Sequence, residues 1–477
     1  MKLGLTFSDV LIIPKITPLK SRDDADTNTK FTRNIFLKIP FVSSNMASVT
    51  EHKMAISMAR EGGLGIIHQF GSIEEQINEI KQVKKSTSYI IKNPACVYPD
   101  ISLENAINIL KNEKVTSLLV KSYDDDLIGI FTSKDYLFET DFTKKIEDVM
   151  TPRKSLITSC YGISLEEAKE ILKEHKIEKL PLIDKSNKIK GLITTKDIKK
   201  IEYWPNAARD KNGQLLVGGA VGVKDTIERT HELLKHGVDV IVLDVAHAHS
   251  YHVINQLKEL KKKFSIDVMV GNIATECAAK DLINAGADGI KVGIGPSSVC
   301  TTRIVTGAGI PQLTAIMDVS KFVSSLNVDV PVCADGGMKS SGDICKAICA
   351  GASTVYSGYF FSGTDESTGI IVTKDGKRYK KYIGSASYES VHKRKQNENN
   401  IMIKDKLQDI FVEGVSSLVD YKGPVEEVIN KLLKGLKSGI SYCGANNIKE
   451  MKENSEFIQI TSSSLEESKS SGIKLFE

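Results

Sequence analysis

The residues best suited to chemistry lie in the segment GIGPSSVCTTR, residues 293–303. Glycines permit a tight turn and let a backbone approach a ligand closely. Serine hydroxyls and backbone N–H groups can hold a phosphate. A cysteine at the edge of such a loop can attack an electrophile that the phosphate tethers. Because a lone cysteine is also compatible with a buried, inert thiol, a catalytic role for Cys300 needs support from the rest of the chain.

The elements that must position this loop form a regular series. Eight short apolar runs end in glycine or polar residues and alternate with segments of helical periodicity. The runs are FVSSNM, LGIIH, LLVGGAVGV, DVIVLDVAH, VMVGNIAT, GIKVGIGP, PVCADGG and TVYSGYFF. Near-continuous apolar strands are typical of a parallel sheet buried on both faces. The sequence therefore predicts an α/β fold, a closed (β/α)8 TIM barrel, with its chemistry at the C-terminal strand ends.

Several polar or glycine-rich positions fall at those strand ends. The carboxylate of Asp335 could accept hydrogen bonds from a ribose diol, with Gly336 and Gly337 beside it. Ser298 and the backbone near Gly358 could hold a phosphate. A nucleotide bound in this way would lie with its base under the Cys300 thiol.

An internal repeat interrupts the barrel pattern after its second helix. ISLENAINILKNEKVTSLLVKSYDDDLIGIFTSKDY begins at Ile101, and ISLEEAKEILKEHKIEKLPLIDKSNKIKGLITTKDI begins at Ile163. Each copy predicts a helix, a strand, a turn, a strand and a second helix opened by Thr/Ser-x-Lys-Asp. Ser102 and Ser164 are predicted N-caps. Two such copies would pack as a pair, each covering the apolar face of the other.

These boundaries predict three segments. The first part of the barrel covers residues 1–87, the repeat module residues 88–203 (copies 88–147 and 148–203), and the rest of the barrel residues 204–477. The last segment contains the Cys loop at 293–303, a flap segment at about 388–416 and a C-terminal tail. The Ser- and Glu-rich residues 454–477 are expected to lack order in the isolated chain.

Composition excludes several classes of function. The chain has 477 residues, with 64 basic and 60 acidic side chains and a formal net charge of +4. That balance predicts neither nucleic acid nor membrane as a partner. The sequence shows no signal-peptide pattern, no apolar run of about 18 residues and, among eight cysteines, no CxxC pair. We therefore expect a reducing, cytoplasmic location.

The barrel resembles the IMP dehydrogenase / GMP reductase family over nearly the whole chain. The resemblance rests on GLTFSDVLIIP, NMASVTE, MAREGGLGIIH, VLDVAHAHS, VGNIAT, GIKVGIGPSSVCTTR, ADGGMKSSGDICKA and KSGISYCGA. The repeat module resembles the tandem CBS module, which that family carries at this position. The family implies that Cys300 is the nucleophile that attacks carbon 2 of a purine nucleotide, GMP or IMP.

The resemblance also implies the residues of the site. Catalysis falls to Cys300, Thr302 and Glu413. Substrate binding falls to Ser44, Met46, Ser298, Asp335, Gly336, Gly337, Gly358, Tyr359, Tyr382, Gly384, Ser385, Ala386 and Glu413. The residues implied to bind the nicotinamide cofactor, NADPH or NAD, are Asp244, Ser250, Asn272 and Gly293. The carbonyls of Gly293, Gly295 and Cys300 match a monovalent-cation site for K+, and Thr132, Asp135, Thr194 and Asp197 match nucleotide-binding positions of CBS modules.

Two activities share the covalent intermediate. GMP reductase converts GMP and NADPH to IMP, ammonia and NADP, whereas IMP dehydrogenase converts IMP, NAD and water to XMP and NADH. Dehydrogenases activate water with an Arg-Tyr pair about a dozen residues before a Glu-Gly or Gln-Gly. Glu413-Gly414 is present here, but that register holds Asn399, Asn400 and Ile401. We therefore favour GMP reductase, with a Thr302–Glu413 dyad to move protons.

Smaller features favour the same choice. Asn45-Met46 matches the Asn-Met of reductases, Thr306-Gly307 replaces the Ala-Gly of dehydrogenases, and GSAS at residues 384–387 lacks their Gly-Met-Gly-Ser. SYCGA and YKGPVEEVI, by contrast, fit dehydrogenases. Tyr359 and Ser297 depart from both patterns, which keeps open a catalytically inactive nucleotide sensor.

The resemblance also implies partners. The family forms homotetramers, and octamers through the CBS modules, and regulatory purine nucleotides bind those modules. For Asp135 and Asp197 a purely local role, capping the segments that follow them, is an equal alternative.

Overall fold

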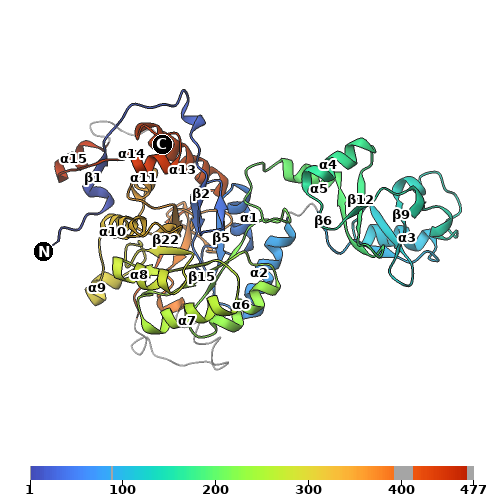
Figure 1. Cartoon of the computed structure of the whole chain (residues 1–477), viewed down its shortest axis with the longest axis horizontal. Coiled ribbons are helices and arrows are strands. Elements are labelled where there is room, and N and C mark those ends of the chain that lie inside the picture. The colour runs from blue at the N-terminus through green and yellow to red at the C-terminus, as the bar shows by residue number, and fades with distance from the viewer. Residues whose placement is uncertain (1, 87–89, 391–411, 470–477) are drawn as a thin grey trace. The chain divides into compact units, whose positions relative to one another are not determined.

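The computed structural model describes residues 2–86, 90–390 and 412–469 and divides the chain into two compact units. The first unit comprises Met1–Ser86, Asn206–Ala208 and Leu215–Glu477, and the second comprises Thr87–Pro205 and Arg209–Gln214 (Figure 1).

The first unit is built on a closed barrel of eight parallel strands in the order β14-β15-β16-β17-β18-β19-β4-β5. The strands are β4 (Phe41–Ser43), β5 (Leu64–Ile67), β14 (Gly218–Val221), β15 (Val240–Asp244), β16 (Val268–Ile273), β17 (Gly289–Val292), β18 (Val332–Asp335) and β19 (Thr354–Ser357). Each lies within one of the eight apolar runs, so the predicted (β/α)8 barrel is confirmed.

A helix follows each barrel strand. The eight helices are α1 (His52–Arg60), α2 (Ile73–Ser86), α6 (Thr226–Lys235), α7 (Tyr251–Lys263), α8 (Glu276–Asn284), α10 (Gln312–Ser325), α11 (Ser341–Cys349) and α13 (Val425–Tyr442). Their sequences bury one apolar face, as α8 does with Ala278, Ala279 and Leu282. A short helix, α9 (Thr302–Thr306), begins inside the Cys loop.

The interior of the barrel is filled by apolar side chains from alternate strand positions. Val42, Leu64, Ile66, Val240, Val242 and Met269 belong to this cluster and are almost fully buried. Because this core fills the barrel, polar groups gather where the strands end.

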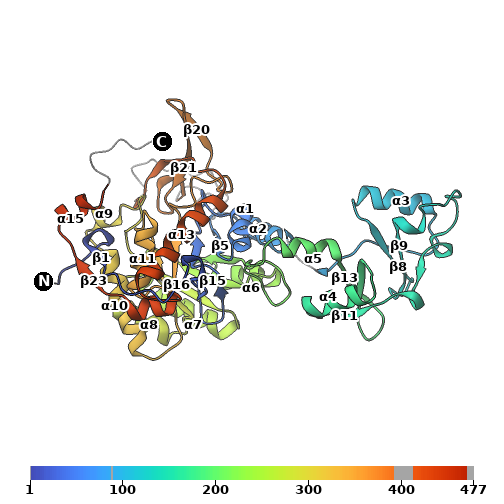
Figure 2. The same cartoon turned by 90° about the horizontal axis from the view of Figure 1, so that it is seen from above.

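Several accessory elements surround the barrel in the first unit. They are β1 (Val10–Ile12) paired with β23 (Phe457–Gln459), β2 (Thr29–Lys30) paired with β3 (Phe36–Leu37), the 3-10 turns η1 (Phe7–Asp9) and η2 (Arg22–Asp24), and the helices α14 (Ile448–Asn454) and α15 (Ser462–Glu467). β20 (Ile371–Lys374), β21 (Lys377–Ile383) and β22 (Ser416–Asp420) form an antiparallel sheet, whose β20–β21 ribbon projects from the barrel in Figure 2.

The expectation of an unordered tail is wrong for its described part. β23 pairs with β1 in antiparallel register, and α15 follows it. Backbone pairing to an N-terminal strand supplies the order that Ser- and Glu-rich composition does not predict.

The second unit repeats one helix and two strands at the predicted 62-residue offset. The first copy contains α3 (Leu103–Asn112), β8 (Ser117–Lys121) and β9 (Leu127–Thr132), and the second contains α4 (Leu165–Glu174), β12 (Lys179–Ile183) and β13 (Ile189–Thr194). Ser102 and Ser164 cap α3 and α4, accepting hydrogen bonds from the backbone N–H groups of Asn105 and Glu167.

Four short strands complete the two sheets of this unit, and two of them pair with a strand of the other copy. β7 (Cys96–Val97) and β11 (Ser159–Cys160) run parallel to β8 and β12. β6 (Ile90–Ile91) begins the first copy but pairs with β13, and β10 (Thr151–Pro152) begins the second copy but pairs with β9. Each copy therefore completes the sheet of the other.

One predicted element of the repeat is wrong. In the second copy Thr195–Glu202 forms α5, but in the first copy the equivalent residues form only a 3-10 turn, η3 (Ser133–Asp135). The segment 136–142 that follows leaves Leu137, Phe138 and Phe142 exposed. Further turns are η4 (Ile146–Asp148) and η5 (Arg153–Ser155).

None of the helices in the described ranges combines the length and hydropathy that crossing a bilayer requires.

Candidate active site

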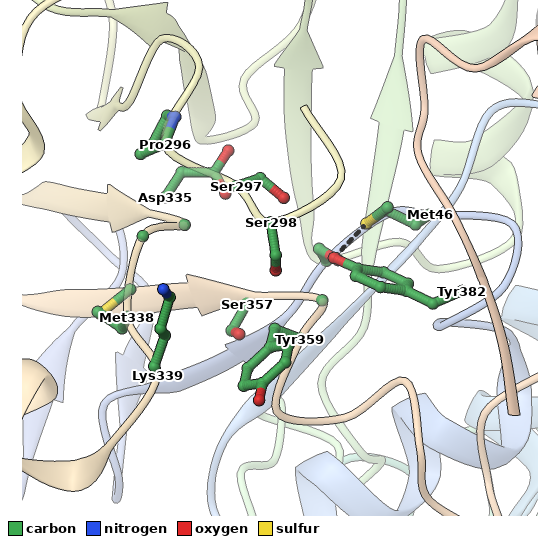
Figure 3. Close-up of a pocket in the computed structure, with 14 residues that line it drawn as sticks. Met46, Pro296, Ser297, Ser298, Asp335, Met338, Lys339, Ser357, Tyr359 and Tyr382 are labelled. Carbon is green, nitrogen blue, oxygen red and sulfur yellow. Dashed lines mark hydrogen bonds between the residues drawn. The ribbon is translucent and has the colours of Figure 1, made fainter. Parts of the chain in front are cut away.

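One pocket at the C-terminal strand ends collects most of the predicted substrate residues (Figure 3). It lies among the loops after β17, β18, β19 and β4, with Tyr382 of β21 closing one side. Nine predicted residues line it: Ser44, Met46, Ser298, Asp335, Gly336, Gly337, Gly358, Tyr359 and Tyr382. Pro296, Ser297, Met338, Lys339 and Ser357 also line it and are additional to the prediction. Loops after the last two strands are where TIM barrels commonly bind phosphate.

Glycine is required on the floor of this pocket. A Cβ atom on Gly358 would lie 2.5 Å from the Tyr382 hydroxyl, 2.7 Å from Met46 Sδ and 2.8 Å from Ser44 Oγ. Gly336 and Gly337 have φ angles of +77° and +83°, which side chains rarely adopt. A side chain at any of these three positions would therefore strain the backbone or collide with the pocket lining.

The Tyr382 hydroxyl stays protonated in this setting. Burial raises the pKa of Tyr382 above its ordinary value, although a hydrogen bond with Ser297 acts in the opposite direction. Ser44 Oγ is buried with no protein hydrogen-bond partner. The Tyr382 hydroxyl also contacts Met46 Sδ at 3.5 Å, so of the two hydroxyls only that of Ser44 lacks a protein partner.

The three predicted catalytic residues lie together beside this pocket. Cys300 Sγ is 3.1 Å from Thr302 Oγ1, and the Thr302 hydroxyl donates to Glu413 Oε2 at 2.6 Å. Glu413 lies 111 residues from Thr302 in the sequence. The two segments are joined by a backbone hydrogen bond, in which the Thr301 N–H donates to the Glu413 carbonyl at 2.8 Å. The thiol, hydroxyl and carboxylate thus form a continuous hydrogen-bonded series.

A second backbone segment holds this series in place. The Gly384 N–H donates to the Val415 carbonyl at 3.1 Å, and the Glu413 N–H donates to the Ala386 carbonyl at 3.1 Å. The Val415 N–H donates to the Val299 carbonyl at 2.9 Å. The predicted segment Gly384, Ser385 and Ala386 therefore lies against the Cys loop rather than in the pocket lining. Asn399, Asn400 and Ile401 lie outside the described residues.

A buried lysine links the ribose side to the cofactor side of the predicted site. Lys291 of β17 is 1% exposed, and its ammonium lies 2.7 Å from Asp244 Oδ1 and 2.6 Å from Asp335 Oδ2. Burial alone would lower the pKa of Lys291, but the charges and hydrogen bonds of Asp244 and Asp335 raise it above its ordinary value. Lys291 therefore stays protonated at neutral pH and shares its single positive charge between the two carboxylates.

Sequence reasoning missed Lys291, although a signal exists. A lysine inside an apolar run that forms a buried strand must be paired, and its partners are then expected at neighbouring strand ends.

Three of the four predicted cofactor residues belong to the hydrogen-bond network around this lysine. Asn272 donates from Nδ2 to the Gly293 carbonyl at 2.6 Å and to Asp335 Oδ2 at 2.8 Å, and it accepts from Lys291. Ser250 serves as the N-cap of α7, accepting from the Val253 N–H at 3.3 Å. Asp244, Asn272 and Gly293 thus share one network, and Ser250 has a local capping role.

The three carbonyls of the predicted cation site belong to the Cys loop. Carbonyl oxygens suit hard cations, and Gly293 and Gly295 have positive φ angles of +152° and +76°. One lone pair of the Gly293 carbonyl already accepts from Asn272. The residues fit a monovalent cation only if further oxygen ligands complete its shell. Within the described ranges no cluster of three His, Cys, Asp or Glu side chains suits a metal ion.

One lysine lines the pocket, and a second contacts Tyr359 behind it. Lys339 lines the pocket directly (Figure 3). Lys422 donates to the carbonyls of Tyr359 and Phe360 at 2.7 and 3.1 Å and lies 4.6 Å from the centre of the Tyr359 ring. Burial lowers the pKa of Lys422 to about 8, against the opposing effect of Asp420.

The two positions that depart from the family pattern are accommodated. Tyr359 lines the pocket and is held through its carbonyl by Lys422. The φ angle of Ser297 is not positive, so a serine fits there without backbone strain.

The four residues predicted to bind a nucleotide lie in the second unit and form two equivalent local pairs. The Thr132 hydroxyl donates to Asp135 at 2.8 Å, and the Thr194 hydroxyl donates to Asp197 at 2.6 Å. The Lys134 and Asp197 N–H groups donate back to the two threonine hydroxyls. This geometry is a capping arrangement in both copies.

Comparisons with known proteins agree with the barrel and with the site. A model described as the IMP dehydrogenase / GMP reductase domain matches residues 4–471. The chain is 47% identical to an inosine-5'-monophosphate dehydrogenase of Nitrosopumilus maritimus over 98% of each chain. It is 41% identical to a GMP reductase of Leishmania donovani over 98% of this chain and 97% of that protein.

A solved structure is similar over the full length. A crystal structure of a GMP reductase from Trypanosoma brucei in complex with guanosine 5'-monophosphate matches with a TM-score of 0.86 and 39% identity, covering 99% of each chain. A GMP reductase structure from the same organism in complex with guanosine 5'-triphosphate matches with a TM-score of 0.75, 37% identity and coverage of 97% of this chain and 99% of that one. The barrel, the strand-end pocket and these matches together show that the chain belongs to the IMP dehydrogenase / GMP reductase family of NAD(P)-dependent oxidoreductases.

Proposed function

We propose that the protein is a GMP reductase, which converts GMP and NADPH to IMP, ammonia and NADP. The observation that carries this choice is the flap sequence, which lacks an Arg-Tyr pair before Glu413. It is supported by the series from Cys300 Sγ through the Thr302 hydroxyl to Glu413, with distances of 3.1 and 2.6 Å. Expelling ammonia requires a proton at the leaving nitrogen, and this series can deliver one.

The chain's own residues perform the following steps. The Cys300 thiolate adds to purine carbon 2, and the amino group leaves as ammonia after taking a proton through Thr302 and Glu413. The carbon–sulfur bond breaks when a hydride reaches carbon 2, which regenerates the thiolate and gives IMP. The reduced nicotinamide supplies that hydride when it is bound. One proton is consumed overall, so atoms and charges balance.

The strand-end pocket supports GMP as the substrate. We assign the ribose hydroxyls to Asp335 and the phosphate to Ser298, Gly337, Gly358 and Tyr382, all of which line the pocket. Lys339 adds a cation there. The structural relative from Trypanosoma brucei carries GMP.

On the cofactor side we assign NADPH to Asp244, Asn272 and Gly293, with Ser250 at the start of α7. The network around Lys291 would hold the nicotinamide ring against carbon 2 and exclude water. K+ at the Gly293, Gly295 and Cys300 carbonyls would order the Cys loop.

The second candidate is IMP dehydrogenase, which oxidises IMP with NAD to give XMP. It is favoured by the 47% identity to a dehydrogenase over 98% of each chain. It is opposed by the sequence of the flap segment, which lacks an Arg-Tyr pair before Glu413.

We further propose that the second unit is a tandem CBS module that binds regulatory purine nucleotides. Its two copies complete one another's sheets, and they place Thr132–Asp135 and Thr194–Asp197 in equivalent positions. A related reductase binds GTP. The family resemblance supports a homotetramer or octamer, and eight free cysteines support a cytoplasmic location.

Two absorbance assays at 340 nm test the choice of activity. We expect NADPH to be consumed with GMP and no NADH to form from IMP, NAD and potassium. In the Thr302→Ala and Glu413→Gln variants we expect turnover with GMP to fall by about 100-fold or more, because proton delivery to a leaving group is worth that much. NADH formation from IMP, with XMP as product, would show the dehydrogenase instead.

A further inference from the structure

The loop after β4 places an amide against the cofactor-side carboxylate. Asn45 is 3% exposed, and its Nδ2 donates to Asp244 Oδ2 at 2.8 Å. The other oxygen of the same carboxylate, Oδ1, lies 2.7 Å from the Lys291 ammonium. Both oxygens of Asp244 therefore already have donors.

A buried tyrosine fixes which end of the Asn45 amide faces Asp244. The Tyr356 hydroxyl accepts from the Asn45 N–H at 3.2 Å and donates to Asn45 Oδ1 at 2.7 Å. Because Oδ1 is held by this donor, Nδ2 must point toward the carboxylate. The Tyr356 ring also lies 4.8 Å from the Lys291 ammonium, so one side chain contacts both donors of Asp244.

We propose that Asn45 and Tyr356 are positioning residues that saturate Asp244 and so favour the reduced, neutral nicotinamide over the oxidised, cationic one. A carboxylate with free oxygens attracts a pyridinium cation but gives little to a neutral dihydropyridine. In Asp244 part of the negative charge is offset by Lys291, which it shares with Asp335, and the second oxygen is occupied by Asn45, so that preference is weakened. This inference rests on the proposed function in one respect, the placement of Asp244 on the nicotinamide side.

Binding of the two redox forms tests the inference without turnover. In a Cys300→Ala background, which cannot form the covalent adduct, NADPH and NADP are titrated separately in the presence of GMP. The measured quantity is the ratio of the Kd for NADP to the Kd for NADPH. A residue that merely supports the fold would weaken both forms alike and leave this ratio unchanged.

Three further substitutions are compared in that background. Asn45→Ala frees Asp244 Oδ2, and we expect the ratio to fall by about fivefold or more, since hydrogen bonds to charged groups are among the stronger ones. Tyr356→Phe keeps the ring but releases the amide, and a smaller fall, about twofold, is expected. Thr50→Val is the matched control, because Thr50 donates to the Ser44 carbonyl in the same loop and does not touch Asp244.

The outcomes separate the two proposals. A fall in the ratio for Asn45→Ala and Tyr356→Phe, but not for Thr50→Val, supports the inference. An unchanged ratio in Tyr356→Phe and Asn45→Ala, in a protein that binds both cofactors, overturns it and leaves the proposed function intact. If Asn45→Ala does not fold, the Tyr356→Phe result decides. Failure of the Cys300→Ala protein itself to bind either cofactor overturns both proposals.

Discussion

Lys291 is the residue through which the two halves of the site depend on one another. Its ammonium contacts Asp244, Asp335 and Asn272, which come from three different strands. Because its pKa is raised above the ordinary value, this stabilisation is present throughout neutral pH and is lost only as pH rises through that raised value.

Replacing this lysine tests its role. In Lys291→Met, two carboxylates lose their cation, and we expect the free energy of unfolding to fall by about 3 kcal/mol in urea titrations. GMP affinity should fall as well, because Asp335 loses its orientation. Lys84→Met is the matched control, since Lys84 is 6% exposed and pairs with Asp239 at 2.6 Å. It should lose stability but retain GMP affinity, and equal losses of affinity in both variants would contradict the role.

Lys422 changes the pH dependence of the free energy of unfolding in the direction opposite to Lys291. The pKa of Lys422 is lowered to about 8 by burial, so between that value and its ordinary pKa the unfolded chain binds more protons than the folded one. This group therefore makes stability rise with pH across that window, by up to about 1.4 kcal/mol per pH unit.

Unfolding free energies of the wild type and Lys422→Met, measured from pH 7 to 10, should diverge above pH 8 in favour of the wild type. The exposed Lys374→Met variant should follow the wild type. Parallel curves for all three proteins would show that Lys422 does not titrate in this window.

At the scale of elements, the loop that carries Gly336 and Gly337 leads into α11, and α11 is fixed by its contact with α13. The two helices meet through equivalent small residues one turn apart. A Cβ atom on Gly435 would lie 2.3 Å from Ser341 Oγ, and one on Gly439 would lie 2.3 Å from Cys345 Sγ. At the next turn Cys349 Sγ and Cys443 Sγ are 3.6 Å apart. Only small side chains permit this close approach.

A pair of glycine substitutions measures that packing. Gly439→Ala should lower the free energy of unfolding by about 1–3 kcal/mol, because the new methyl group overlaps a buried sulfur. Gly342→Ala, also in one of the two helices, meets nothing closer than Ser340 Oγ at 3.6 Å. It should leave stability unchanged or raise it by less than about 1 kcal/mol, as alanine favours the helix. Equal effects in thermal or urea unfolding would argue against the close helix contact.

At the scale of the whole molecule, the two units have separate cores. The barrel is filled by its own apolar cluster, while the second unit has one cluster in each copy and one that joins them. The joining cluster contains Leu119, Leu127 and Ile130 from the first copy and Leu192 from the second. With strand exchange, this makes the two copies one cooperative unit.

Leu192→Ala should therefore affect both copies but not the barrel. We expect the second unit to lose about 2–5 kcal/mol of stability, and hydrogen exchange should accelerate in β8 and β9 as well as in β12 and β13. Exchange in the barrel strands should not change. Leu137→Ala is the control, because Leu137 is 66% exposed, and faster exchange confined to the second copy would contradict cooperativity.

The sequence by itself determined the features that depend on local periodicity. The eight barrel strands are apolar runs of the right length, and the repeat in the second unit holds its 62-residue offset because equivalent caps and apolar positions recur. The pocket was predictable to the extent that strand ends of a parallel barrel converge on one face.

Only the tertiary structure decided the contacts between distant segments. The Thr302–Glu413 hydrogen bond spans 111 residues, so no local pattern specifies it, and the sequence predicted this dyad only through the family resemblance. The pairing of Lys291 with Asp244 and Asp335 depends on which strand ends are neighbours in the closed barrel. The missing helix after η3 likewise shows that the same Thr/Ser-x-Lys-Asp opening continues as a helix only where the following residues can bury an apolar face. Local propensity begins such elements, whereas burial against the rest of the fold decides whether they persist.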